Sequence, residues 1–480
     1  MARTITILQI NDLHGYIEPH PEVVRHGADV EFRSLGGLSR IAALYRQIRN
    51  ETDGAVHALD NGDTFHGTYI AVKSKGHALT PMMNALGLDA MTAHWEFAYG
   101  PEGFKALAAK LNYPVLAINV FDKAIGELAF PPYLVVDRAG LKIGVIGLAC
   151  PIVDKTMPPA FSEGIRFTLG RDELPSWIER VRQAEKVDLV VVLSHLGFPQ
   201  DVKLAREVSG IDVLVSGHTH NRIHEPAVEN GAIIFQSGCH GSFIGRLDLT
   251  VQDGKVRAFR HKLIPVDEEL GQDEEMQALV EAAAGPHRSL LGEVVGHTRV
   301  PLHRYAMLHT AMDDLLLDAI AAAANVEIAF SNGSRYGAPI PPGPITVNDL
   351  WNIIPTNPPV STVDLSGAEI TALFEENLER TFAANPYEQM GGYVKRCRGL
   401  NLYLKAENPR GHRIDRLFAE GAPIEPARRY QWAFVTAQGV PVKFGRNRKN
   451  LDICAVDALR AWLVKNVAGD TSPRRSVTAV

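Results

Sequence analysis

The sequence predicts a layered α/β domain followed by a smaller α+β domain. From residue 4 to about residue 265, short apolar runs alternate with amphipathic segments, among them 38–49, 101–111 and 173–185. This alternation is typical of strands layered against helices. Buried strands are predicted at the apolar runs 5–10, 55–59, 188–193 and 211–215.

The predicted domains are residues 1–267 and 293–480, joined by a connecting helix over 268–292. The connecting segment is acidic and rich in alanine, and Met276, Leu279 and Val280 have helical spacing. In the second domain we expect helices at 311–324 and 367–381, strands at 326–330 and 400–404, and loops at 331–337 and 385–398.

Composition excludes several classes of function. The net charge of −6 and the absence of a long basic run argue against a nucleic-acid polymer or a membrane surface as partner. No apolar stretch approaches the ~18 residues of a membrane span. The start shows no signal peptide, so we expect a soluble cytoplasmic protein, or a periplasmic one if a signal has been removed.

Five short polar clusters follow predicted strands. Strand ends at one edge of an open α/β sheet converge where such sheets bind ligands. Any one cluster alone could be a turn or a surface histidine, but five in order indicate a metal site. The clusters are Asp12-Leu13-His14, Gly62-Asp63, His94-Trp95-Glu96, Ser194-His195 and Gly217-His218-Thr219-His220.

Seven candidate ligands come from these clusters, and all are His or Asp. A set of carboxylates and imidazoles without a thiolate suits Mn²⁺, Zn²⁺ or Fe rather than Ca²⁺. A carboxylate can bridge two ions about 3.5–4 Å apart, and such a pair activates water. Asp63, alone after a glycine turn, is the predicted bridge. The candidates are Asp12, His14, Asp63, His94, His195, His218 and His220.

These clusters resemble the calcineurin-like metallophosphoesterase domain of the 5'-nucleotidase superfamily, and the later region resembles that family's C-terminal substrate-binding domain. The resemblance implies a four-layer α/β/β/α sandwich followed by an α+β substrate domain. It also implies two divalent metal ions that share Asp63. One would be held by Asp12, His14, Asp63 and His220, and the other by Asp63, His94, His195 and His218.

The third cluster departs from the nucleotidase pattern Gly-Asn-His-Glu-Phe-Asp-Tyr-Gly. Here the metal-binding Asn is His94, the following His is Trp95, and its Asp partner is Ala98. In the nucleotidases that His–Asp pair assists the leaving group. A general acid contributes about 10²–10⁴-fold, so this site should prefer good leaving groups or obtain a donor from elsewhere.

The segment His-Trp-Glu-Phe-x-Tyr-Gly resembles the SoxB-type sulfate thiohydrolases, which use two manganese ions and cleave a sulfonate from a persulfide-linked carrier protein. Residues 386–392, followed by Arg396 and Gly399-Leu400, are similar to the same branch. One feature disagrees, because the thiohydrolases are exported and this chain shows no export signal.

We therefore expect hydrolysis of a phosphate ester by a metal-bound hydroxide, with a nucleotide or related small phosphoester as substrate. The alternatives are a SoxB-like thiohydrolase with a sulfur-carrier protein as partner, or a catalytically weak metal-binding module. Mn²⁺ is the first choice of metal, with Zn²⁺ or Fe next. Trp95 is expected to pack over the site, and Arg335 and Arg396 to orient the substrate, unless either forms a surface ion pair.

Overall fold

The structure is a computed structural model that describes residues 2–27, 29–332, 337–436, 438–470 and 474–480. The chain forms two compact units, residues 1–286 and residues 287–480. Among the described residues, no helix combines the length and the apolar character needed to cross a membrane.

Two sheets form the centre of the first unit. The first sheet has the order β15 (Lys255–Pro265), β14 (Phe243–Gln252), β1 (Arg3–Ile10), β4 (Val56–Asp60) and β5 (Ala90–Met91). The second has the order β12 (Ala227–Glu229), β13 (Ala232–Phe235), β11 (Val213–Val215), β10 (Leu189–Ser194), β8 (Leu141–Leu148) and β7 (Tyr133–Arg138).

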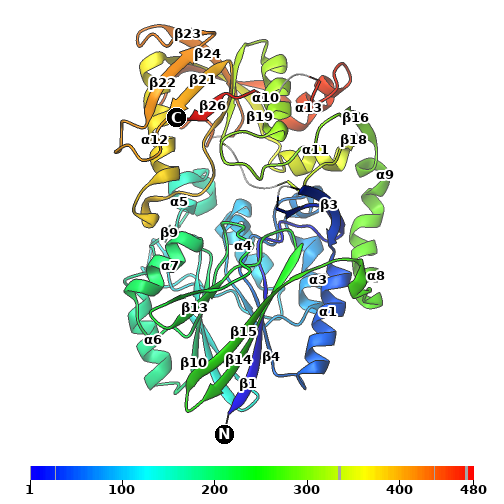
Figure 1. The fold of residues 1–480 in the computed structure, drawn as a ribbon, viewed down its shortest axis with the longest axis vertical. Coiled ribbons are helices and arrows are strands. Elements are labelled where there is room, and N and C mark those ends of the chain that lie inside the picture. The colour runs from blue at the N-terminus through cyan, green and yellow to red at the C-terminus, as the bar shows by residue number, and fades with distance from the viewer. Residues whose placement is uncertain (1, 28, 333–336, 437, 471–473) are drawn as a thin grey trace. The chain divides into compact units, whose positions relative to one another are not determined.

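Helices lie on both outer sides of this pair of sheets (Figure 1). On one side are α1 (Leu38–Glu51), α3 (Thr80–Ala85) and α8 (Glu274–Ala284), and on the other α6 (Leu174–Gln183) and α7 (Phe198–Glu207). The alternation along β10 explains the layering. Val191 packs in the core between the sheets, whereas Val190 and Val192 pack in the core that includes α6 and α7. The predicted four-layer α/β/β/α arrangement is confirmed.

Parallel pairing brings several strand ends to one edge of each sheet. Strand β1 pairs in parallel with β4, and β4 with β5. In the second sheet, β10 pairs in parallel with both β8 and β11. The chain segments that leave β1, β4, β5, β10 and β11 carry the five polar clusters predicted from the sequence.

Smaller elements complete the first unit. They are the hairpin β2 (Pro19–His26) and β3 (Asp29–Gly36), the pair β6 (Val120–Asp122) and β9 (Ile165–Phe167), the helices α2 (Tyr69–Lys73), α4 (Pro101–Ala108) and α5 (Val153–Thr156), and the 3-10 turns η1 (His77–Leu79), η2 (Trp95–Tyr99), η3 (Pro159–Ser162) and η4 (Glu268–Leu270).

The segment predicted as a single connecting helix contains two helices. Helix α8 belongs to the first unit, where the amide of Asp273 at its N-cap donates to the carbonyl of Ser39 at 3.0 Å. The turn η5 (Gly285–His287) separates it from α9 (Arg288–Leu291), and the division between the units falls between Pro286 and His287. The domain boundaries at 267 and 293 stay predictions.

The second unit is built on a five-stranded and a four-stranded sheet. The orders are β20 (Arg396–Arg398), β17 (Ile328–Ser331), β24 (Arg429–Phe434), β19 (Pro359–Ser366), β25 (Arg446–Cys454), and β23 (Ala422–Pro423), β22 (Ile414–Ala419), β21 (Leu400–Leu404), β26 (Val477–Ala479). Other elements are the pair β16 (Val294–Thr298) and β18 (Gly343–Thr346), the helices α10 (Ala311–Ala324), α11 (Val347–Ile353), α12 (Gly367–Phe382) and α13 (Ala455–Leu463), and η6 (Pro386–Glu388).

The predicted helices and strands of this unit are found within a few residues, and one predicted loop needs a correction. The other predicted loop, at 331–337, includes residues 333–336, which lie outside the described residues. The loop predicted over 385–398 ends as strand β20, which pairs antiparallel with β17. The strand forms because Cys397 is buried in the core that also contains Phe330 and Trp432, and pairing with β17 satisfies its backbone.

Candidate metal centre

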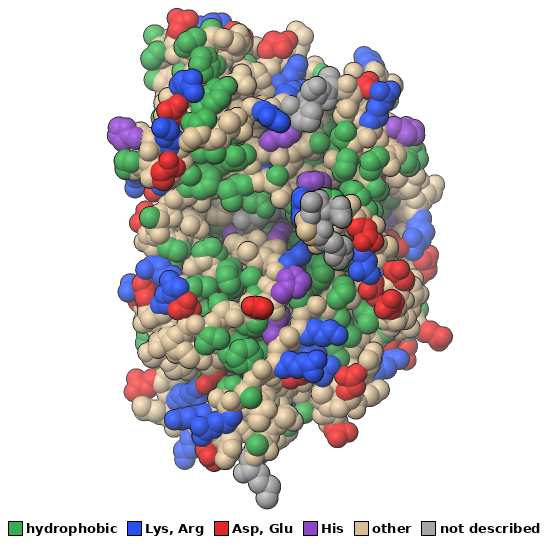
Figure 2. All heavy atoms as spheres, in the orientation of Figure 1, with side chains coloured by type: hydrophobic (Ala, Val, Ile, Leu, Met, Phe, Trp, Pro, Cys, Tyr) green, Lys and Arg blue, Asp and Glu red, His purple; other side chains and the backbone are tan. Residues whose placement is uncertain are grey.

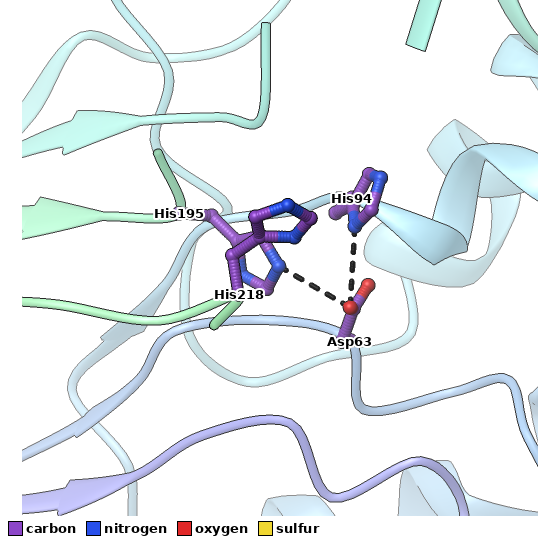
Figure 3. A group of neighbouring side chains, drawn as sticks. All are labelled: Asp63, His94, His195 and His218. Atoms are coloured by element: carbon purple, nitrogen blue, oxygen red, sulfur yellow. Dashed lines mark hydrogen bonds and ion pairs between the residues drawn. The ribbon is translucent and has the colours of Figure 1, made fainter. Parts of the chain in front are cut away.

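The seven predicted ligands converge in the first unit and form two groups. In each group, one potential ligand atom per residue lies within 4.8 Å of the others. The first group is Asp12, His14 and His220, and the second is Asp63, His94, His195 and His218. Figure 3 shows the second group, in which the ion pairs of His94 and His195 meet at Asp63.

Asp63 lies between the two groups. Its Oδ2 is 3.2 Å from His94 Nδ1 and 3.2 Å from His195 Nε2. The same oxygen is 3.7 Å from His14 Nε2, which belongs to the first group. In that group, Asp12 Oδ1 is 3.2 Å from His220 Nε2. The geometry therefore places one carboxylate within reach of both groups.

The backbone at the site is held in an unusual conformation. Five of the seven candidates have left-handed φ angles between 49° and 75°, namely Asp12, His14, Asp63, His218 and His220. A side chain with a Cβ pays roughly 1–2 kcal/mol for that conformation. Strain of this kind gathers where the fold must aim side chains at a functional site.

Hydrogen bonds between the loops hold this conformation. The amide of Asp12 donates to the carbonyl of Gly62 at 3.0 Å, and the amide of His14 donates to the carbonyl of Asp63 at 2.7 Å. A side chain on Gly62 would place a Cβ 2.5 Å from the carbonyl oxygen of Thr92. These hydrogen bonds join the first cluster to the second. A glycine is required at position 62 because the second cluster there lies against the backbone that leads into the third.

Two buried carboxylates outside the predicted ligand set, Glu96 and Asp201, support the candidate ligands. Glu96 accepts from the amides of Thr64 at 2.7 Å and His94 at 2.8 Å, so it ties the second cluster to the third. Asp201 accepts from the hydroxyls of Ser194 and Ser216, both at 2.6 Å, and so joins the ends of β10 and β11. Asp201 lies on α7, and its position carries no sequence signal.

The electrostatics of the site favour ionised carboxylates beside imidazoles. Burial alone would raise the pKa of Asp63, but His94 and His195 outweigh it and hold that pKa well below its usual value. Burial opposes protonation of His195, yet Asp63 and Asp12 raise its pKa to about 9. In contrast, burial lowers the pKa of His14 to about 4. Asp63 therefore stays negatively charged at neutral pH.

The residues fit a pair of divalent cations. Asp12 Oδ1 and His195 Nε2 are buried and make no hydrogen bond within the described part of the chain, although charged atoms lie within 4 Å of each. Buried polar atoms without such bonds are costly unless a cation satisfies them. Oxygen and imidazole donors without a thiolate suit Mn²⁺, Zn²⁺ or Fe.

Trp95 borders the second group and lies on a histidine that sequence reasoning missed. Its amide donates to Asp63 Oδ1 at 2.7 Å. Its ring stacks on the imidazole of His66, with the centroids 4.9 Å apart and the planes at 21°. It also makes a T-shaped contact with Phe161, with the ring centroids 6.3 Å apart. Burial lowers the pKa of His66 to about 3.

The two predicted substrate arginines differ in what the structure shows. Arg335 lies outside the described residues. Arg396 is buried in the second unit, where its Nε donates to Asp313 Oδ2 at 3.0 Å and its Nη atoms donate to the carbonyls of Ala306 and Met307. All three guanidinium nitrogens are thus bonded within the unit. A role for Arg396 in orienting substrate stays a prediction.

Comparison with known protein families agrees with the fold and the site. A family model described as calcineurin-like phosphoesterase matches residues 5–222, and one described as 5'-nucleotidase, C-terminal domain, matches residues 294–436. The trifunctional nucleotide phosphoesterase protein YfkN of Bacillus subtilis is 26% identical over 85% of this chain, which spans 30% of that protein. A probable 5'-nucleotidase of Treponema pallidum is 26% identical, with 78% of this chain and 75% of the relative covered.

Solved structures show the same architecture. The sulfate thiohydrolase SoxB of Thermus thermophilus superposes with a TM-score of 0.91 at 26% identity and covers 99% of this chain and 96% of its own. A 5'-nucleotidase precursor, also from Thermus thermophilus, superposes with a TM-score of 0.87 at 23% identity over 99% of both chains, a likeness of fold. The chain therefore belongs to the calcineurin-like phosphoesterases of the 5'-nucleotidase superfamily, and it is a metal-dependent hydrolase that acts on ester bonds.

Proposed function

We propose that this protein binds two divalent metal ions and hydrolyses a small phosphoester, with a nucleotide as the first candidate substrate. The observation that carries the proposal is the convergence of two acid–imidazole groups on Asp63. The Treponema pallidum and Vibrio cholerae relatives are named as 5'-nucleotidases, which supports a nucleotide.

The proposed ligand sets follow the two groups, with Asp63 shared. Two metals bound there would activate water and neutralise charge on the group that is transferred. The protein's own contribution is orientation. The amide of Trp95 holds Asp63 Oδ1, which leaves Oδ2 facing His94, His195 and His14. Mn²⁺ is proposed first, with Zn²⁺ or Fe as alternatives.

The surface is consistent with a small-molecule substrate. On the face shown in Figure 2, acidic and basic side chains are interspersed on both units, and the described side chains of that face form no continuous basic band. A nucleic-acid polymer requires such a band for its phosphates. The face in Figure 2 therefore gives no reason to propose a nucleic-acid polymer as partner.

A second candidate is release of sulfate from an S-sulfonated persulfide carried on a protein. Two observations favour it. The third cluster has Trp95 and Ala98 where nucleotidases have His and Asp, and the SoxB structure covers 99% of the chain with a TM-score of 0.91. A persulfide is a good leaving group, so loss of a leaving-group donor would matter less for it.

The experiment is turnover in Mn²⁺ of three substrates: AMP, an activated aryl phosphate and an S-sulfonated persulfide peptide. AMP cleavage supports the nucleotidase, and activity confined to the peptide supports the thiohydrolase. Two bound metals with no turnover of any substrate would refute catalysis and leave the metal-binding module.

Asp63→Asn tests the shared ligand in the same assay. We expect it to lose at least one metal and nearly all activity, because the amide carries no charge to hold two cations. Asp172→Asn is the matched control, since the side chain of Asp172 is 91% exposed and belongs to neither group. Retained turnover in Asp63→Asn would refute the bridging assignment.

A further inference from the structure

We propose that His66 is a catalytic residue whose imidazole donates a hydrogen bond to the leaving group of the substrate bound at the metal centre. The inference deepens the proposed function and rests on it. It assigns a role to an imidazole that lies between the elements carrying the two metal groups.

The backbone of His66 is fixed to the first group. His66 lies in the segment after β4, three residues beyond Asp63. Its carbonyl oxygen is 3.2 Å from His14 Nδ1, which leaves His14 Nε2 directed toward Asp63. A carbonyl that holds the distal nitrogen of a ligand histidine is the usual way such a ring is oriented.

The side chain of His66 is fixed to the second group. The ring lies flat on Trp95, which directly follows His94. Tyr99 makes a second, tilted ring contact with His66 at 5.8 Å, and its hydroxyl donates to the carbonyls of Phe65 and Ala71. The imidazole is therefore held by aromatic contacts and has little freedom to turn.

Both ring nitrogens of His66 lack a partner in the described part of the chain. Nδ1 is buried and unbonded, and no hydrogen bond is formed by Nε2. Only 4% of the residue is exposed. A buried polar group left unsatisfied costs about 1–3 kcal/mol, so such a group in a native protein calls for a ligand or a catalytic role.

The imidazole of His66 lies where it could replace the histidine that the third cluster lacks. Residues 93–100 carry Trp95 and Ala98 in place of the His–Asp pair of the nucleotidases. His66 supplies an imidazole from the neighbouring loop, stacked on the tryptophan that occupies the histidine position. An imidazole donates from at least one nitrogen in either charge state, so the role requires no change of protonation.

The test compares His66→Gln with His66→Phe. Gln keeps an N–H donor but loses the aromatic ring, whereas Phe keeps the ring on Trp95 and loses the donor. We measure bound Mn²⁺, kcat and KM across aryl phosphates whose leaving groups differ in pKa. His240→Gln is the matched control, because His240 is also buried and its ring lies 5.9 Å from that of His14, on Tyr16 and away from Trp95.

We expect both His66 variants to bind the same amount of Mn²⁺ as the wild type. In His66→Phe, kcat should fall about 10²-fold for the poorest leaving groups and much less for the best. KM should change little, and His66→Gln should recover part of the loss. His240→Gln should show no dependence on the leaving group.

The inference is wrong if His66→Phe keeps wild-type kcat, if Gln is worse than Phe, if either variant loses metal, or if the loss is the same for every leaving group. Those outcomes leave the proposed function standing, because the wild type still turns over. A wild type that binds Mn²⁺ and cleaves no ester removes the proposed function, and this inference with it.

Discussion

Removal of the Asp201 carboxylate should loosen the edge of the second sheet that presents two candidate ligand histidines. Asp201, on α7, is fully buried and accepts from Ser194 and Ser216 at 2.6 Å each. Ser194 immediately precedes His195, and Ser216 stands two residues before His218. The hydroxyl of Ser194 also accepts from the amide of Leu196, and the hydroxyl of Ser216 accepts from Gln236 Nε2. Each hydroxyl proton is therefore donated to Asp201.

The magnitude follows from these two bonds. In Asp201→Ala both hydroxyl donors stay buried without an acceptor, at about 1–3 kcal/mol each, so the loss of unfolding free energy should be about 2–6 kcal/mol. Asp201→Asn keeps one acceptor oxygen and leaves one hydroxyl donor unsatisfied, so it should lose about 1–3 kcal/mol. Because supporting groups of this kind alter metal affinity by about 10–100-fold, the Ala variant should also bind Mn²⁺ more weakly.

Stability should depend on pH through the same carboxyl. Burial raises the pKa of Asp201 to about 7, against an ordinary value of 3.8. The folded protein therefore binds this proton more tightly than the unfolded chain does. The resulting stabilisation is complete below about pH 4 and is lost as pH rises through 7, by about 4 kcal/mol at 1.36 kcal/mol per pKa unit. Asp201→Asn cannot titrate at this position and should lack this pH-dependent change in unfolding free energy.

The assay is urea unfolding of the metal-free protein at pH 5 and pH 8, followed by circular dichroism, with metal affinity measured separately. Other buried carboxyls, such as Asp60, titrate in all variants and cancel in the difference. The reasoning is refuted if Asp201→Ala unfolds within about 0.5 kcal/mol of wild type, a margin typical of neutral surface changes. It is equally refuted if the difference between wild type and Asp201→Asn is the same at both pH values.

Two further substitutions test the backbone of the site and the second unit. Gly62→Ala should destabilise the protein by more than about 2 kcal/mol, because its Cβ would meet the Thr92 carbonyl at 2.5 Å. Gly126→Ala is the control, since Gly126 also has a positive φ but its Cβ would meet nothing within 4 Å. Equal melting temperatures for the two variants would contradict the steric argument. Arg396→Met should cost about 3–5 kcal/mol, because one of the two guanidinium partners of buried Asp313 is lost. A stable variant with a raised KM would instead favour the substrate role.

The convergence of the candidate metal ligands could be predicted from the sequence because their signal is local. The candidates of four clusters follow an apolar run that can be recognised as a strand, and parallel strands end at one edge. His94 follows β5, which has only two residues and no such run. The structure places Asp12 after β1 and His195 after β10 as that logic requires. The sequence pattern could not predict the backbone conformation of the loops that follow the strands. The left-handed φ angles of Asp12 and His14, for example, depend on hydrogen bonds to the second cluster.

The supporting residues could not be predicted because their partners are distant in sequence or unremarkable in type. Asp201 lies at a position indistinguishable from a solvated charge near a helix start, and only the fold brings Ser216 to it. The bonds of Arg396 likewise could not be predicted, because a sequence does not show that Asp313, 83 residues earlier, faces it; its role toward the substrate stays a prediction. A charged residue in a promising segment therefore needs its partners known before it is given a chemical role.

His66 is a residue for which the sequence predicted no role, because its contacts are visible only in the fold. A histidine after a Gly-Asp turn is an ordinary loop residue in the sequence, and the third cluster taken alone indicates only that an imidazole is missing. The structure connects His66 with the missing imidazole, because the ring of His66 stacks on Trp95 of the third cluster. Because stacking fixes the plane of an imidazole without using its nitrogens, Trp95 can hold the ring of His66 in place while both nitrogens stay open to a substrate.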